Sequence, residues 1–173
     1  VEPAQGERVH RAFLADRQGD PRRAFAQSLL QALGSSGPVF AYNAGFERNR
    51  IRELAQCFED LSDALEALLP RIVDLFQVAR THYYHPAMRG SWSFKSVFRT
   101  IAPELDATRF DCDGEPSAQA AFAHSLQPGI DAPTRERLRE ALRLHGERQV
   151  AALHRMVSMF EHADGAAGPA PVD

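Results

Sequence analysis

The junction at residues 38–58 constrains the fold most, because a short apolar run there passes directly into a long amphipathic pattern. Residues 39–42 (VFAY) are rich in β-formers and too short for a helix, and Gly37-Pro38 and Asn43 bound them. Apolar residues then recur at helical spacing, at Ile51, Leu54, Ala55 and Phe58. The pattern predicts a buried strand followed by a helix, with the Asn43 side chain as the helix N-cap.

Glu47 begins the same helical stripe, which predicts a carboxylate at the inward edge of the first turn. The carboxyl end of a strand is where open α/β sheets usually bind ligands. Two ordinary explanations compete with a ligand site, because an Asn before a helix often only caps it and a Glu in the first turn interacts favourably with the helix dipole. On the residues alone, both interpretations of the junction stay open.

Neighbouring patterns predict that strands and helices alternate around this junction. Asp20 is expected to cap the first helix with Pro21 at its first position, and Gly34 is expected to end it. In chain order, the predicted elements are a strand at 9–14, a helix at 21–33, the strand and helix of the junction, a short helix at 61–69, a strand at 72–75, short helices after 93 and at 118–126, and a long helix at 133–162. This order favours an α/β fold with a mixed or parallel sheet over a helical bundle.

Length and composition are those of an ordinary globular chain. With 173 residues, 44% of them hydrophobic and 25% charged, we expect one domain over residues 1–163 and a disordered tail at 164–173. No apolar run is long enough for a membrane span and the N-terminus does not resemble a signal peptide, so we expect a cytoplasmic protein without a membrane partner. Cys57 and Cys112 lack metal-type spacing and are expected as reduced thiols. The net charge of −3 argues against a basic coat but allows a local basic cleft.

Residues 82–92 (HYYHPAMRGSW) have the most unusual composition of the chain, with aromatic rings interleaved with basic groups. Such a pattern suits base stacking and phosphate contact, although an aromatic loop can also fold back as a lid over the core. Lys95, which follows, is the only lysine in the chain and a candidate phosphate or carboxylate contact. The candidate substrate-binding residues of this loop are Tyr83, Tyr84, Arg89, Trp92 and Lys95.

Acidic and polar residues elsewhere have ordinary and functional interpretations that both stay open. Asp74 either caps the helix that follows it or is a site residue, whereas Asp111 and Asp113 fit a solvent-facing glycine turn. On the last helix, the apolar stripe passes through His145 and Gln149, which should therefore face inward. Buried polar groups need partners, so these two side chains either form local hydrogen bonds or line a cavity.

Two of these stretches resemble known families. The run YNAGFERNRIRELA (42–55) resembles the second motif of three-prime to five-prime exonucleases of the DEDD type, in which an Asn, a Phe and an acidic residue open a helix after a strand. Together with residues 73–105, it is similar to a bacterial family, domain of unknown function 2779, over roughly 13–160. The resemblance implies a ribonuclease H-like mixed sheet flanked by helices. It also implies a nuclease that uses Mg²⁺ or Mn²⁺, with Glu47 as metal ligand and Asn43 and Phe46 at the substrate.

The sequence departs from this exonuclease pattern at two motifs. No strand with an Asp-x-Glu pair precedes the junction, so the first strands of the sheet are expected to be missing. The Tyr and Asp of the third motif are replaced by His145 and Gln149, and an amide is a weak ligand for Mg²⁺. Two-metal hydrolysis needs several carboxylates, and the resemblance leaves only Glu47 among them.

Three hypotheses follow. The first is a nuclease-like domain acting on DNA or RNA, degenerate in this chain, with Glu47 and His145 as the candidate catalytic residues. The second is a non-catalytic module that binds nucleic acid or a protein through residues 82–95. The third is a sheet that a second copy or a partner chain completes at an exposed edge formed by residues 9–14.

Overall fold

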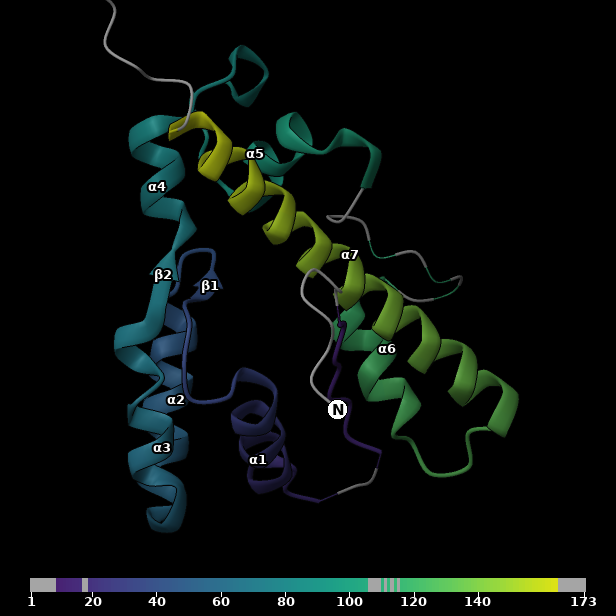
Figure 1. Ribbon diagram of the computed structural model, residues 1–173. Helices are drawn as coiled ribbons and strands as arrows, with labels where there is room; N and C mark the ends of the chain where they lie inside the picture. Colours follow the sequence, from purple (N-terminus) through teal and green to yellow (C-terminus); the bar gives the residue numbers. More distant parts are fainter. Residues whose placement is uncertain are drawn as a thin grey trace, which may run out of the picture.

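A computed structural model describes residues 9–16, 19–105, 110, 112, 114 and 116–164 (Figure 1). In this part of the chain the helices are α1 (Arg22–Leu33), α2 (Gly45–Cys57), α3 (Ser62–Glu66), α4 (Leu75–His82), α5 (Phe94–Ile101), α6 (Ala118–Ser125) and α7 (Ala132–Asp164), and the strands are β1 (Val39–Ala41) and β2 (Ile72–Asp74). Asp111, Asp113 and residues 165–173 lie outside the described residues, and so does the expected tail apart from Asp164.

The two strands form a parallel pair, and α2 and α3 provide the connection between them. Val39 pairs with Ile72 and Ala41 pairs with Asp74, which brings the carboxyl ends of the strands side by side. The fold is therefore α/β, as predicted. The described residues contain this one two-stranded sheet and no antiparallel pair, so the expected mixed sheet is not seen among them.

The first hydrophobic core lies between the sheet and helices α1, α2 and α3. Ile51, Leu54 and Ala55 of α2 are buried there, which confirms the helical stripe predicted from the sequence. Leu65 and Leu68 come from the α3 region and are also buried. Apolar spacing thus set which face of α2 turns toward the core.

Arg71 ties the end of α1 to the start of β2. Its guanidinium donates to the carbonyls of Gly34 at 2.7 Å, Gly37 at 2.8 Å and Leu33 at 2.8 Å, and also to that of Ser36. Gly34 has a φ of 54° and ends α1, as its sequence position predicted. The carbonyl groups left free at the helix end are therefore satisfied by an arginine from a distant segment.

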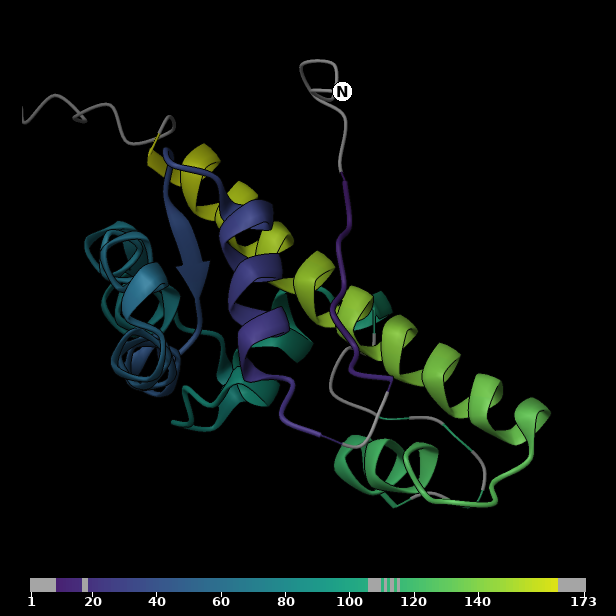
Figure 2. The ribbon, with the colours of Figure 1, turned by 90° about the horizontal axis from the view of Figure 1, so that it is seen from below.

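The second core joins α4 and α5 to the C-terminal half of α7. Leu75, Val97 and Met156 are buried at their contact. The long helix α7 crosses the molecule diagonally, and α6 lies alongside its N-terminal half (Figures 1 and 2). α7 therefore packs against α4 and α5 at its C-terminal half and against α6 at its N-terminal half.

The strand predicted at residues 9–14 is wrong, because this segment has no regular secondary structure. At its C-terminal end, an arginine side chain and not a neighbouring strand binds the backbone carbonyl groups. Arg139 of α7 donates to the carbonyls of Ala15 at 2.8 Å and Leu14 at 3.0 Å. The exposed sheet edge expected at residues 9–14 is therefore not present, and the pairing hypothesis built on it falls.

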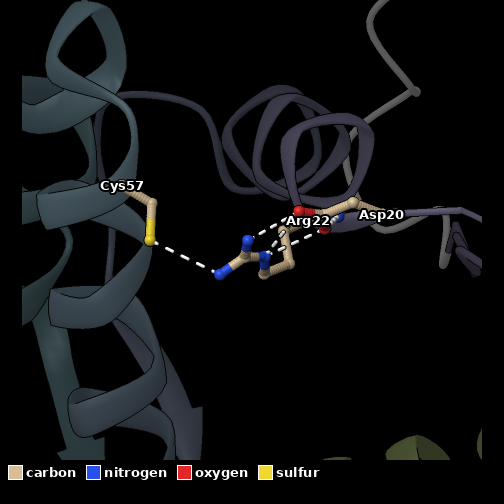
Figure 3. Close-up of polar contacts among 3 residues, drawn as sticks. All are labelled: Asp20, Arg22 and Cys57. Carbon is tan, nitrogen blue, oxygen red and sulfur yellow. Dashed lines mark hydrogen bonds and ion pairs between the residues drawn. The ribbon is translucent and has the colours of Figure 1, made fainter.

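The start of α1 lies one residue later than predicted, with Pro21 at the N-cap position in place of the expected Asp20. The helix begins at Arg22, and the Asp20 carboxylate accepts the Arg22 backbone N–H at 3.0 Å. Figure 3 shows the Arg22 guanidinium between this carboxylate and the sulfur of Cys57, which lies 3.5 Å from Nη1. Cys57 and Cys112 are both free.

Of the helices described, including α7 with its 33 residues, none combines the length and apolar content needed to cross a membrane.

Candidate functional site

The carboxylate of Asp74 organises the carboxyl end of the sheet. Its Oδ1 accepts the backbone N–H of Asn43 at 2.8 Å and of Phe76 at 3.0 Å, and its Oδ2 accepts that of Ala44 at 3.1 Å. One side chain thus caps α4 and also holds the turn that leads from β1 into α2. Of the two roles left open for Asp74, the structure shows the helix cap.

The predicted N-cap role of Asn43 is wrong. α2 begins at Gly45 after Ala44, which makes no side-chain cap hydrogen bond, and Asn43 adopts a left-handed conformation with φ of 59°. The register of the sheet explains the difference. Since Asp74 pairs with Ala41, its carboxylate lies beside the turn and accepts the N–H groups of Asn43 and Ala44, which fixes the turn before the helix without an Asn43 cap.

A pocket of about 600 Å³ opens at this end of the sheet. It is lined by Tyr42, Asn43, Phe76, Arg80, Gly90, Trp92, Ser93 and Phe94. All four aromatic rings are half-buried, so each is held by the protein and still presents surface to the pocket. The edge-on packing of Tyr42 against Phe76 and Phe94, at centroid distances of 5.8 and 5.5 Å, fixes three of these rings relative to one another.

Hydrogen bonds fasten the aromatic loop to the rest of the pocket. The Tyr42 hydroxyl donates to the Trp92 carbonyl at 2.6 Å, and the Trp92 indole N–H donates to the Tyr83 carbonyl at 3.1 Å. The Tyr83 hydroxyl in turn bonds the Thr100 hydroxyl of α5 at 3.0 Å. Burial, assisted by the nearby charge of Asp74, raises the pKa of Tyr42 to about 12, so its hydroxyl keeps its proton at neutral pH.

The segment that builds three of the pocket walls is positively charged. Residues 75–103 contain four basic residues, Arg80, Arg89, Lys95 and Arg99, and no Asp or Glu. The Arg80 side chain lines the pocket and is exposed, and within the described residues it forms no ion pair or hydrogen bond. A chain with net charge −3 therefore presents a local positive field, as the sequence allowed.

Only two of the seven predicted substrate-binding residues line the pocket. Asn43 and Trp92 line the pocket, whereas Tyr83 is half-buried against Phe160 of α7 at a centroid distance of 6.3 Å. Tyr84 is 58% exposed and packs beside Trp92 at 5.9 Å. The remaining three, Phe46, Arg89 and Lys95, are exposed and do not line the pocket.

Six residues that line the pocket were not among the predicted site residues: Tyr42, Phe76, Arg80, Gly90, Ser93 and Phe94. A signal for two of them was present, because Phe76 and Arg80 are four residues apart on α4 and so share a helix face. Ser93 was expected to cap a helix, and its hydroxyl does accept the N–H of Ser96 at 3.2 Å. Phe94 follows that cap directly.

The residues predicted for a metal centre do not form one in the part of the chain that the structure describes. Glu47 is exposed, so its predicted inward position is wrong, and the buried stripe of α2 begins at Ile51. Its neighbour Phe46 is 68% exposed, with Arg50 over its ring. Among the described residues, no three His, Cys, Asp or Glu side chains group closely enough to hold a metal ion.

His145 and Gln149 are half-buried on α7 and bond to each other, with 3.1 Å between the Nε2 atoms. The local pairing that the sequence allowed is therefore present. The Phe110 ring packs edge-on against the imidazole at 5.5 Å, and the buried His145 Nδ1 has no hydrogen-bond partner among the described residues. An imidazole and an amide supply no carboxylate for Mg²⁺ or Mn²⁺.

Comparison with protein families gives one match, to the domain of unknown function DUF2779, over residues 1–93. The chain belongs to this family. Comparison with curated proteins and with solved structures gives no match. The DUF2779 match ends earlier than the resemblance predicted, at Ser93, but it includes β1, α2, β2, α4 and the aromatic loop. Every residue that lines the pocket except Phe94 lies within it.

Proposed function

We propose that this DUF2779 chain is a non-catalytic module that binds single-stranded nucleic acid at the carboxyl end of β1 and β2. The observation that carries the proposal is the pocket itself, which is lined by four half-buried aromatic rings and by the exposed Arg80. Aromatic rings stack on bases, and an arginine fork binds phosphate oxygens through two parallel hydrogen bonds. These are the two kinds of contact that single strands offer without unpairing.

The charge distribution supports the same choice of ligand. The segment that forms α4, the loop and α5 carries basic residues and no carboxylate, and its Arg80 lines the pocket, so an anionic backbone is attracted to this part of the molecule. The Asp74 carboxylate lies nearby, but backbone N–H groups take both of its oxygens. A duplex keeps its bases stacked and paired, so it could use only the phosphate contacts.

The test is fluorescence anisotropy with labelled single-stranded DNA and RNA of mixed sequence, and the matching duplexes as competitors. We expect binding that weakens as salt rises and that duplex competes for poorly. Arg80→Gln should weaken binding by about tenfold, because it removes a charged hydrogen-bond donor from the phosphate. Arg52→Gln is the matched control, since it removes the same charge from an exposed position on α2, and it should bind as the wild type does.

Equal loss in the two variants would mean that only overall charge matters and would overturn the assignment of the pocket. Absence of binding by the wild-type protein would overturn the proposed function.

A ribonuclease H-like ancestry is a second proposal, supported by the parallel β1–β2 pair with Asn43 and Glu47 just beyond the end of β1. It implies metal binding, which the described side chains do not favour. Calorimetric titration of Mn²⁺ into the protein and into Glu47→Ala decides the point. We expect no saturable heat from either. Tight binding that disappears in Glu47→Ala would instead support a surviving nuclease centre.

A further inference from the structure

We infer that the pocket binds a single nucleotide as its unit of recognition, a heteroaromatic base that carries a phosphate. This inference rests on the proposed function and narrows it. A strand could be held by many weak contacts spread over the surface. The pocket instead concentrates its rings and its cation in one cavity of about 600 Å³, within the range of small-molecule sites.

The base half of the site is defined by rings that the protein has already fixed. Tyr42 is anchored through its hydroxyl to the Trp92 carbonyl, and Trp92 is anchored through its indole N–H to the Tyr83 carbonyl. These bonds join the end of β1 to the loop, so the rings do not have to be ordered when a ligand enters. Such preorganisation lowers the entropic cost of binding, and it favours a flat aromatic ligand over a flexible apolar one.

The phosphate half is defined by Arg80. It lies one helical turn beyond Phe76 on the same face of α4, so a ligand beside the Phe76 ring has the guanidinium within the same cavity. No carboxylate lines the pocket, and none in the described residues pairs with Arg80. An unpaired guanidinium in an aromatic pocket disfavours cationic ligands. A neutral nucleoside has no phosphate for this guanidinium to bind, so it can use only the aromatic half of the site.

The same chemistry can come from a free mononucleotide or from one nucleotide of a strand. Trp92 reports the binding of either one, because it is the only tryptophan in the chain and lines the pocket. Titration with each ligand in turn then separates the two sources. The experiment follows the fluorescence of Trp92 during titration with adenosine monophosphate, adenosine, inorganic phosphate and a short oligodeoxyadenylate. We expect saturable quenching by the monophosphate and the oligonucleotide, and binding of adenosine weaker by about tenfold, because a charged hydrogen bond is lost.

Arg80→Gln should reduce the affinity for the monophosphate to that for adenosine. Arg99→Gln, an exposed arginine of the same positive segment that does not line the pocket, should leave it within about twofold of the wild type. Thermal unfolding followed by circular dichroism checks that both variants are folded. The comparison of monophosphate with adenosine on the wild-type protein remains decisive even if a variant is unstable.

The outcomes separate the inference from the proposed function. Binding of the oligonucleotide without binding of the monophosphate overturns the inference and leaves the function standing. Binding of the monophosphate alone supports the inference and overturns single-strand binding. Equal affinity for adenosine and its monophosphate overturns the role of Arg80. Absence of any response overturns both.

Discussion

Replacing Asp74 with alanine removes three backbone hydrogen bonds from the carboxyl end of the sheet at once. The N–H groups of Asn43, Ala44 and Phe76 lose their acceptor. Bonds to a charged group contribute about 1.5–3 kcal/mol each, but bonds that share one carboxylate are not additive and water can replace part of them. We therefore expect Asp74→Ala to lower the free energy of unfolding by about 2–4 kcal/mol.

Asp74→Asn separates the individual bonds. The amide oxygen can keep the place of Oδ1 and accept from Asn43 and Phe76, while the amide nitrogen faces the N–H of Ala44 and cannot accept it. The expected loss is about 1–2 kcal/mol. The pKa of Tyr42 should also fall toward its usual value, because the charge of Asp74 is one of the two causes that raise it.

The assay for both variants is urea unfolding at pH 7 followed by circular dichroism, with absorbance of tyrosinate for the pKa. Asp63→Ala is the matched control, since it removes an exposed carboxylate of α3 that bonds no other group in the described residues. It should change the free energy of unfolding by less than about 0.5 kcal/mol. If Asp74→Ala were as stable as Asp63→Ala, the account of Asp74 as a shared cap would be refuted.

Further predictions concern an arginine tether and two ionisable groups. Arg71→Lys should lower the free energy of unfolding by about 1–3 kcal/mol in the same assay, because an ammonium cannot reach the four carbonyls that the guanidinium binds; unchanged stability would contradict this. The pKa of Tyr42 is raised to about 12, so the folded state keeps a proton that the unfolded state loses above about pH 10. The free energy of unfolding should therefore fall between about pH 10 and pH 12, and the fall should be smaller in Tyr42→Phe. The hydrogen bond from Arg22 lowers the pKa of Asp20 to about 2, so its contribution should be lost as the pH falls from about 4 to about 2, and Asp20→Asn should remove that part of the acid unfolding curve.

Local patterns in the sequence predicted the elements well because the physics that sets them is local. The spacing of Ile51, Leu54 and Ala55 fixed the buried face of α2, and Gly34 and Ser93 marked helix ends through their own backbone and side-chain chemistry. The alternation along the chain predicted a mixed or parallel sheet, and the described strands form a parallel pair.

The errors arose where the hydrogen bonds of a segment are made by a residue that is distant in the sequence. Asp74 of β2 holds the turn before α2 by accepting the N–H groups of Asn43 and Ala44, which depends on strand register and cannot be read from either segment alone. Arg139 of α7, and not a neighbouring strand, binds the carbonyls of Leu14 and Ala15. The pocket was missed for the same reason, since its rings come from the turn after β1, from α4, from the loop and from α5.

The single indole of Trp92 gives the most direct test of single-strand binding at the pocket. A ¹⁵N-labelled sample has one indole N–H resonance, because the chain has one tryptophan. We predict that this resonance shifts saturably when a single-stranded oligonucleotide is added and that it stays in place with a duplex of the same sequence. An indole resonance that does not move while backbone resonances elsewhere shift would place binding outside the pocket and contradict the account.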